Sequence, residues 1–353
     1  PVGDLNIAKE ECIIGRGLCA LRSKLNNGRF LYYLLKGNNN YITSFGSGAV
    51  YEAINKDSVE NLVFNIPDEL TQQKISSILS AYDDLIENNT RRIQILEEMA
   101  QRIYKEWFVD FRFPGHEKIK FIDSELGKIP EGWMVKKIED ILEYYIGGGW
   151  GKGSEETKHI IPAYVIRGTD IPNVRRGNIV SCPLRYHTEL NFRSRELQKG
   201  DIIFEVSGGS KDQPVGRALL INEFTLRAFN KPVICASFCK LMRVDHHIIS
   251  PELLYLKLLE TYENKSIYKY QVQSTGISNF KFEYFINSET ILVPSKMVKE
   301  KFIEIVEPIF NAITLYGQKN MKLIETRDLL LPKLISGELD VSDLDIKIRE
   351  EKL

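Results

Sequence analysis

The sequence predicts an α+β protein with two globular domains separated by two long antiparallel helices that form a coiled coil. The two halves are expected to be related by a pseudo-twofold internal repeat. Two observations predict this fold. Bulky side chains recur every seven residues in two segments, and each member of the second set lies 227 residues after its counterpart in the first. Short strand-like runs separated by Gly, Asn and Pro turns fill residues 130–293 between them. The heptad positions are Ile75, Tyr82, Asn89, Leu96 and Ile103, then Phe302, Ile309, Tyr316, Leu323 and Leu330.

The long helices are expected over residues 68–110 and 297–334. Asp68 suits an N-cap, Phe113-Pro114-Gly115 ends the first helix, and Gly337 ends the second. Helices of roughly 39 residues would each be about 58 Å long, which favours a rod with one domain at each end. The alternative is two unrelated amphipathic helices, each packed on its own domain. The companion seam positions of the first helix are placed three residues after the heptad set, at Ile78, Leu85, Arg92 and Met99.

The repeat extends beyond the helices with slowly changing offsets. Three matched pairs occur in the same order: Pro1-Val2-Gly3 with Pro214-Val215-Gly216, Phe30–Leu35 with Leu253–Leu258, and Ser47-Gly48 with Thr275-Gly276. The second copy begins near Pro130, well before its Pro-Val-Gly, whereas the first begins at Pro1. We therefore expect the N-terminal half of the first globular domain to be missing from this chain.

These signals divide the chain into six segments. They are residues 1–66, the C-terminal part of domain 1; 67–112, the central long helix; 113–129, a linker; 130–294, domain 2; 295–337, the distal long helix; and 338–353, a charged tail that is expected to fray. Short strands and turns are expected in residues 1–66, with a helix near Gly28–Leu35. In domain 2 the expected strands are Ala163–Ile166, Asp201–Val206, Ala218–Ile221, Val233–Met242 and Thr290–Val293, and the expected helix is Pro251–Glu263.

Bulk properties exclude several classes of protein. A chain of 353 residues with 43% apolar residues is long enough for two or three packed domains. Its net charge of -1 rules out a global polybasic surface, so any nucleic-acid contact must use local patches. No run of eighteen apolar residues is present, so we expect no membrane partner. The five cysteines lack the spacing of a zinc site, and the expected location is the prokaryotic cytoplasm.

Several segments carry a resemblance to a known family. The helical ones are Gln72-Gln73-Lys74-Ile75, Asp83-Asp84-Leu85-Ile86 and Leu330-Leu331-Pro332-Lys333-Leu334-Ile335-Ser336-Gly337-Glu338. The globular ones are Pro130-Glu131-Gly132-Trp133, Gly200-Asp201-Ile202-Ile203 and the two Pro-Val-Gly segments. In this order and duplication the chain resembles the specificity (S) subunit of a type I restriction–modification system.

The resemblance implies a fold and a set of partners. Such subunits have two target-recognition domains, each followed by a long helix, and read a bipartite target in double-stranded DNA. It implies two methyltransferase (modification) subunits and endonuclease/translocase (restriction) subunits as partners. No cofactor is expected in this subunit, because S-adenosylmethionine, ATP and Mg would belong to those partners. The missing half-domain departs from the family pattern and places recognition by the first domain in question.

A local excess of basic residues suggests where DNA would bind. Between Lys158 and Lys231 there are twelve basic and seven acidic residues, an excess of +5 in a chain of net charge -1. Cations contact phosphates, and planar polar side chains contact base edges. The DNA-binding candidates are Arg167, Arg175, Arg176 and Arg193, then Ser207, Gly208, Lys211 and Gln213, then Gln273, Ser274 and Thr275, and in the first domain Thr43 and Ser44.

No motif for catalysis is found, so the chain is expected to be non-catalytic alone. Gly147-Gly148-Gly149-Trp150-Gly151-Lys152-Gly153 lacks the Gly-Lys-Ser/Thr ending of a phosphate-binding loop. It is either a flexible loop near DNA or a plain linker. Two other functions remain open. One is a non-enzymatic coiled-coil assembly or scaffold protein, and the other is an enzyme that uses this Gly-rich loop.

Overall fold

The computed structural model describes residues 2–25, 27–46, 53–208, 213–274 and 277–348. The protein is α+β, as predicted, and divides into two compact units. Unit 1 comprises residues 1–88 and 320–353, and unit 2 comprises residues 89–319. Both long helices, α4 (Glu69–Tyr104) and α10 (Lys296–Ser336), contribute a part to each unit.

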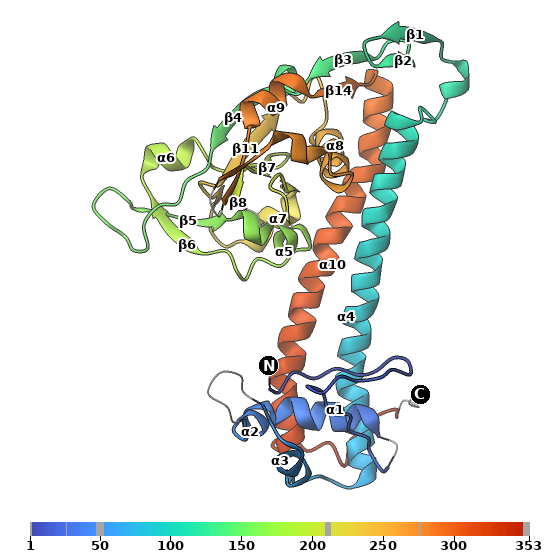
Figure 1. The fold of residues 1–353 in the computed structure, drawn as a ribbon, viewed down its shortest axis with the longest axis vertical. Coiled ribbons are helices and arrows are strands. Elements are labelled where there is room, and N and C mark those ends of the chain that lie inside the picture. Colours follow the sequence, from blue (N-terminus) through green and yellow to red (C-terminus); the bar gives the residue numbers. More distant parts are fainter. Residues whose placement is uncertain (1, 26, 47–52, 209–212, 275–276, 349–353) are drawn as a thin grey trace. The chain divides into compact units, whose positions relative to one another are not determined.

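In unit 1 the two long helices lie side by side and run antiparallel (Figure 1). Asn320 donates a hydrogen bond from Nδ2 to the carbonyl of Ile86 at 3.2 Å. Further along, Arg327 pairs with Asp83 at 2.5 Å. Residue numbers therefore rise along α10 as they fall along α4.

The two long helices also run antiparallel to each other in unit 2. The rings of Trp107 and Phe302 lie 5.9 Å apart, and Arg92 donates to the Tyr316 hydroxyl at 2.9 Å. Shifting Trp107 and Phe302 by 227 residues gives Leu334 and Ile75, which share one apolar cluster of unit 1. Equivalent helix contacts thus occur in both units, as a pseudo-twofold repeat requires.

The second set of seam positions, which accompanies the heptad set, differs from the expected one. The exposed fractions of Leu85 and Met99 are 50% and 45%, so their assignment to the seam is wrong, and Arg92 is exposed as well. The companions instead follow the heptad set by four residues. On α4 they are Leu79, Ile86, Ile93, Ala100 and Trp107, and on α10 they are Val306, Ile313, Asn320, Arg327 and Leu334, all buried or half-buried.

The heptad set itself lies on the packed face. Ile75, Asn89, Phe302 and Ile309 are buried, whereas Tyr82, Leu96, Ile103, Tyr316, Leu323 and Leu330 are half-buried. Steps of three and four residues both fit a heptad. The sequence offered an apolar residue at either step, as at Leu85 and Ile86, which is why the phase was assigned wrongly.

The globular part of unit 1 is helical. It contains α1 (Gly28–Gly37), α2 (Asn39–Thr43) and α3 (Lys56–Glu60). Asn27 caps α1 by accepting from the backbone N–H of Phe30 at 3.1 Å, and α1 then packs Phe30 and Leu34 against α4 and α10. The described residues of 1–66 form no sheet, so the prediction of short strands there is wrong.

The end of the chain also differs from expectation. Within the described part of the tail, residues 338–348, Val341 is almost fully buried in the core of unit 1 and Ile346 packs beside it. Lys74 on α4 donates to the carbonyl of Ser342 at 2.5 Å. This segment is docked rather than frayed, because Val341 and Ile346 pack on the core while its other apolar side chains stay exposed.

Unit 2 carries the sheets. The largest has the order β4 (Leu142–Gly147), β11 (Cys239–Val244), β7 (Ile202–Glu205), β9 (Ala218–Leu220). A second has β10 (Val233–Cys235), β5 (Ile161–Ile166), β6 (Leu184–His187), and a third has β12 (Gln271–Ser274), β13 (Ile277–Phe280), β8 (Ser207–Gly208). Two antiparallel pairs join β1 (Phe121–Ser124) to β2 (Gly127–Pro130) and β3 (Met134–Lys137) to β14 (Thr290–Val293).

Helices cover these sheets. They are α5 (Ile171–Arg175), α6 (Glu189–Arg193), α7 (Glu223–Ala228), α8 (Pro251–Glu263) and α9 (Phe282–Ser288). The main core of unit 2 joins the sheet at Phe204 to α8 at Tyr255 and to the long helices at Phe302. Tyr255 packs edge-on against Phe310 at 5.4 Å, which fixes α8 against α10.

Most of the expected elements of domain 2 are confirmed, with two corrections. The single strand expected over Val233–Met242 is two strands, because residues 236–238 turn the chain from one sheet into another. The expected linker 113–129 contains β1 and most of the hairpin that β1 forms with β2. Before it, α4 ends in a π-helical turn (Lys105–Val109), and Phe111 has a positive φ of 57°.

Unit 1 repeats strand sequences of unit 2 without their sheet. Residues 13–21 align with residues 233–241 in sequence, so that Leu21 corresponds to Leu241. Leu241 is 1% exposed inside the four-stranded sheet, whereas Leu21 is 45% exposed. The apolar pattern of a strand is therefore present in both copies, but only the second copy buries it in the described chain.

No helix within the described residues is both long enough and apolar enough to cross a membrane.

Candidate nucleic-acid interface

Strand ends from two sheets of unit 2 meet at one place. In the largest sheet β11 is antiparallel to β4 and β7, so the start of β11 lies beside the ends of those strands. In the second sheet β10 runs parallel to β5, and residues 236–238 connect the end of β10 to the start of β11. We call the loops gathered here, residues 147–153, 166–168, 206–208 and 236–238, the loop face. Loops on a rigid sheet are where proteins commonly place binding residues.

Two of the predicted loops are joined in one small sheet beside this face. Ser207 and Gly208 form β8, which pairs with β13, and β13 pairs with β12. Ser207 donates to Asn279 at 2.9 Å, and the backbone N–H of Phe280 donates to Val206 at 2.9 Å. Ser207 and Gly208 therefore lie in the same three-stranded sheet as Gln273, a candidate from a distant part of the sequence.

Some candidates are not characterised by the structure. Lys211 and Thr275 lie outside the described residues, as does the matched pair Ser47-Gly48 with Thr275-Gly276. Ser274 ends β12, and the structure describes its backbone only. Gln213 is described and exposed beside the start of β9.

The two candidates of unit 1 use their hydroxyls within a helix end. Thr43 donates to the carbonyl of Asn40 at 3.1 Å, and Ser44 donates to that of Tyr41 at 2.6 Å. Both bonds lie in the C-terminal turn of α2, where the carbonyl of Asn40 also accepts from the backbone N–H of Ser44 at 3.2 Å. This local role accounts for both residues without DNA.

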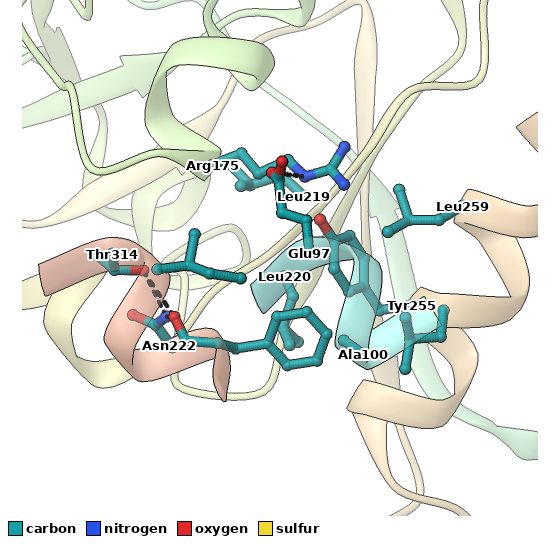
Figure 2. A pocket seen from close by; sticks show the side chains of 12 residues that line it. Glu97, Ala100, Arg175, Leu219, Leu220, Asn222, Tyr255, Leu259 and Thr314 are labelled. Carbon is teal, nitrogen blue, oxygen red and sulfur yellow. Dashed lines mark hydrogen bonds and ion pairs between the residues drawn. The ribbon is translucent and has the colours of Figure 1, made fainter. Parts of the chain in front are cut away.

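Arg175 and Arg176, expected to contact DNA, are instead directed at α4. Arg175 pairs with Glu97 at 3.3 Å and Arg176 pairs with the same carboxylate at 3.1 Å. Figure 2 shows the Arg175–Glu97 pair beside Tyr255, lining a small cavity of about 20 Å³ between α4, α8 and α10. Both arginines therefore have an intramolecular acidic partner that the sequence did not reveal, and the single carboxylate offsets one of their two positive charges.

The other two predicted arginines also have acidic partners. Arg167 binds Asp170 through a pair at 2.8 Å. Burial alone would raise the pKa of Asp170, but hydrogen bonds from Arg167 and Ser181 lower it. Arg193 pairs with Glu189, four residues earlier on α6, at 2.5 Å, and its side chain is 75% exposed. Arg193 thus stays accessible, whereas Arg167 is held against its own turn.

A buried ion pair supports the loop face from beneath. Glu205 at the end of β7 binds Arg217 at 2.5 Å, and the two side chains are 2% and 13% exposed. A Cβ on Gly168 would lie 2.3 Å from this carboxylate, so glycine is required where the loop after β5 crosses it. The pair is structural, and it orders two loops of the face together.

The Gly-rich segment 147–153 is packed rather than free. Gly148 donates to the carbonyl of Cys239 and Gly149 to that of Cys235, both at 2.9 Å. A Cβ on Gly148 would lie 2.2 Å from the carbonyl of Ala236, so this glycine allows close approach of two backbones. The segment is neither of the two alternatives left open by the sequence, a flexible loop or a plain linker.

Cations without acidic partners cluster on this segment, and sequence reasoning did not single them out. Arg185 on β6 lies over the indole of Trp150 at 4.6 Å and donates from Nε to its carbonyl at 3.3 Å. Arg195 donates to the carbonyl of Gly147 at 2.8 Å. Neither arginine forms an ion pair with an acid in the described part of the chain, and the same holds for Lys152 and Lys158.

Beneath the segment lies a buried histidine. His187 is 1% exposed, and a Cβ on Gly151 would lie 2.6 Å from its Cε1. Burial lowers the pKa of His187, and the positive charges of His159, Arg185 and Arg195 lower it further. Its ring is therefore neutral at physiological pH. A neutral side chain in this position adds no further positive charge beneath a segment that is already close to several cations.

Comparison with known proteins decides the family. A sequence model described as the type I restriction modification DNA specificity domain matches residues 1–98 and 130–325. The chain belongs to this family. It is therefore a DNA specificity subunit of the type I restriction–modification class, and a scaffold role is not favoured.

Individual relatives agree. The MjaIX specificity subunit of a type I restriction enzyme from Methanocaldococcus jannaschii is 27% identical over 358 residues, covering 98% of this chain and 77% of that protein. The HindI specificity subunit from Haemophilus influenzae is 25% identical, covering 88% and 77%. The crystal structure of an S subunit from M. genitalium is similar in fold, with a TM-score of 0.54, 16% identity and coverage of 87% of this chain and 72% of that one.

The loop face of this specificity subunit has a rigid base. Two of the sheets meet at the loop face, the Glu205–Arg217 pair and close glycine contacts fix the loops, and the unpaired cations lie on segment 147–153 and its neighbours. Within the described residues no group of three or more His, Cys, Asp or Glu side chains is arranged to hold a metal ion.

Proposed function

We propose that unit 2 reads one half of a bipartite DNA target with its loop face. The observation that carries this is the meeting of cations and polar loops at one end of the sheets. Trp150 and Phe238 are 41% and 57% exposed there, which offers apolar contacts to base methyl groups. Ser207 and Gln273 lie in the adjoining small sheet and offer hydrogen bonds to base edges.

The phosphate contacts are assigned to Lys152 and Lys158. Both side chains are exposed, Lys152 within the loop face and Lys158 six residues further along the chain, and neither has an acidic partner in the described chain. Lysines of this kind bind phosphates as mobile point charges, and each releases counterions when it does so. The affinity for DNA should therefore fall steeply as salt rises.

We further propose that the chain is non-catalytic and acts through partners. The expected partners are two methyltransferase subunits, which would hold S-adenosylmethionine, and restriction subunits, which would use ATP and Mg. The absence of any catalytic motif in the sequence supports this division of labour. The long helices supply extended surfaces beyond their shared seam for such docking.

The proposal is tested by fluorescence anisotropy of labelled duplex DNA with the full chain at several salt concentrations. The logarithm of affinity should fall linearly with the logarithm of salt concentration. A double variant, Lys152→Ala with Lys158→Ala, should reduce the magnitude of that slope by about two, one for each phosphate contact. The matched control is Lys296→Ala with Lys301→Ala at the start of α10. An affinity that does not depend on salt concentration contradicts the proposal. So does an equal reduction of the slope in the control variant.

A footprint addresses the bipartite target. Two protected blocks separated by an accessible spacer are expected. One continuous protected block would contradict a split target.

A further inference from the structure

We infer that Arg185, stacked on Trp150, reads a guanine in the half-site bound by unit 2. The inference rests on the proposed function, since it names a base contact made by the loop face. Arg185 is absent from the arginines that the sequence singled out, and its role emerges only from its surroundings in the structure.

The guanidinium is held in a fixed plane. Its Cζ lies 4.6 Å from the centre of the Trp150 indole, and its Nε donates to the Trp150 carbonyl at 3.3 Å. A cation held on an aromatic face and by a backbone acceptor loses little freedom on binding. Its orientation is set before DNA arrives.

The support for this plane is itself rigid. Arg185 belongs to β6, where it is opposite Ala163 of β5. Two residues after Trp150, Lys152 exchanges backbone hydrogen bonds with Tyr186 at 2.9 and 3.0 Å. Both members of the stack are therefore tied to the same sheet, and the stack does not depend on a mobile loop.

The two terminal nitrogens remain available for recognition. In the described residues neither Nη1 nor Nη2 of Arg185 has a protein acceptor or an acidic partner. Two parallel N–H donors of a planar guanidinium match the O6 and N7 acceptors of guanine in the major groove. A phosphate is contacted equally well by flexible cations, and Lys152 and Lys158 already supply those nearby.

The exposed Trp150 edge defines the neighbouring contact. Its 41% exposed indole lies beside the guanidinium and offers an apolar surface to the next base. Arginine and tryptophan together therefore present a charged donor pair flanked by an apolar wall. This combination favours a G·C pair over an A·T pair, because adenine places a donor where guanine has O6.

The test is selection of duplexes from a randomised pool by the full chain, followed by sequencing. The wild-type chain should enrich a G·C pair at one position of one half-site. Arg185→Lys keeps the charge but loses the planar donor pair, so preference for that base pair should fall by about 10-fold to 100-fold. Trp150→Leu keeps the backbone acceptor but removes the stack, and should weaken preference at the same position. Arg227→Lys, at an exposed arginine of α7 that lies over the Phe224 ring, is the matched control and should change nothing.

The outcomes separate cleanly. The neutral variant Arg185→Ala identifies a phosphate contact: a uniform loss of affinity for all sequences, with a salt slope reduced by about one and no loss of base preference, overturns the inference. Unchanged preference in Arg185→Lys and in Trp150→Leu overturns it as well. A wild-type chain that enriches no sequence refutes the proposed function together with the inference. Circular dichroism and thermal melting of these variants establish that they fold like the wild type.

Discussion

Glu97 on α4 binds two arginines that, in sequence, look like ligands for DNA. Their real partner is 78 and 79 residues away along the chain, and no local pattern reveals it. The acid is half-buried beside Tyr255, so removing a cation leaves a poorly solvated charge rather than a free surface. Arg175 and Arg176 thus anchor the end of α5 to the helix pair.

The variant Arg175→Met should lower the free energy of unfolding by about 2 kcal/mol, because it leaves Glu97 with one partner and without its more buried one. The slope of DNA affinity against salt should stay unchanged. Chemical denaturation and a salt-dependent binding titration check the two parts. A reduced salt slope with unchanged stability would return Arg175 to the list of phosphate contacts.

His187 makes the stability of unit 2 depend on pH. Burial holds its folded pKa below the value of about 6.5 in the unfolded chain. As pH falls below that value, the unfolded chain binds a proton first, so stability is complete above about pH 6.5 and declines below it. His159, Arg185 and Arg195 face the ring and add to the shift, whereas the side chain of Asn191 opposes it.

His187→Gln should remove this part of the decline. The melting temperatures of the wild type and the variant, followed from about pH 7.5 down to about pH 5, should converge as the pH falls. Parallel melting profiles over the whole range would show that His187 does not titrate between the folded and unfolded states.

The candidate site shows which residue properties a sequence reveals. Ser207, Gly208 and Gln273 were predicted from loop composition, and the structure joins them in one sheet. Arg185 was missed because two features make it a candidate for contacting DNA, and neither is visible in the sequence. It stacks on Trp150, 35 residues earlier, and it lacks an acidic partner in the described chain. Counting charge along the chain cannot separate such a cation from Arg175, since ion pairing is decided in three dimensions.

At the scale of elements, the long helices show how far periodicity reaches. Heptad spacing located α4 and α10 within a few residues, and matched spacing predicted their repeat. Heptad spacing did not determine whether the second seam residue of each heptad lies three or four residues after the first, because apolar residues occur at both positions. Packing chose the four-residue step in both helices, burying Ala100 and exposing Met99 on α4.

A pair of matched substitutions tests this phase. Ile93→Asp should lower the free energy of unfolding by about 4 kcal/mol, because it places an unpaired carboxylate in the apolar seam of unit 2. Met99→Asp, at a three-residue-step position of the same helix and 45% exposed, should change it by less than about 0.5 kcal/mol. Urea denaturation measures both. Equal effects at the two sites would contradict the phase described above.

Strands depend on their neighbours more than helices do. The segment around Leu21 carries the same apolar spacing as β11, yet the described part of unit 1 contains no sheet to receive it. A strand satisfies its backbone only by pairing, and so the pattern alone does not form one. This explains why strands were predicted correctly in residues 130–293 and wrongly in residues 1–66.

Truncating equivalent leucines should separate the two copies. Leu241→Ala should lower the free energy of unfolding of the chain by about 3 kcal/mol, since it opens a cavity in the sheet core. Leu21→Ala, at the matching position in unit 1, should cost less than about 0.5 kcal/mol because its side chain is largely exposed. Thermal and urea denaturation of the full chain measure the difference. A large loss at Leu21 would show that residues 13–21 are buried in solution.

At the scale of the whole molecule, the recognition domain of unit 2 is built as an exchangeable segment. β3 near its start pairs with β14 at its end, with Val135 opposite Leu292, so both ends of residues 130–293 meet in one small sheet. Several side-chain links also tie the segment to the long helices. They include Arg175–Glu97, Lys199–Glu307 and Asn222–Thr314.

Replacing residues 130–293 by the matching segment of another specificity subunit should therefore change one half-site of the DNA target and leave the other as it was. The helix seam lies outside the exchanged segment, so the donor needs to keep only the contacts that the segment makes with α4 and α10. A donor without a cation opposite Glu97 should fold poorly, and adding Glu97→Gln to that exchange should restore stability, since it removes the unpaired charge. Sequencing of duplexes selected by the exchanged full chain gives the readout. If both half-sites change, the segment does not read DNA independently. If neither changes, the loop face is not where unit 2 contacts its target.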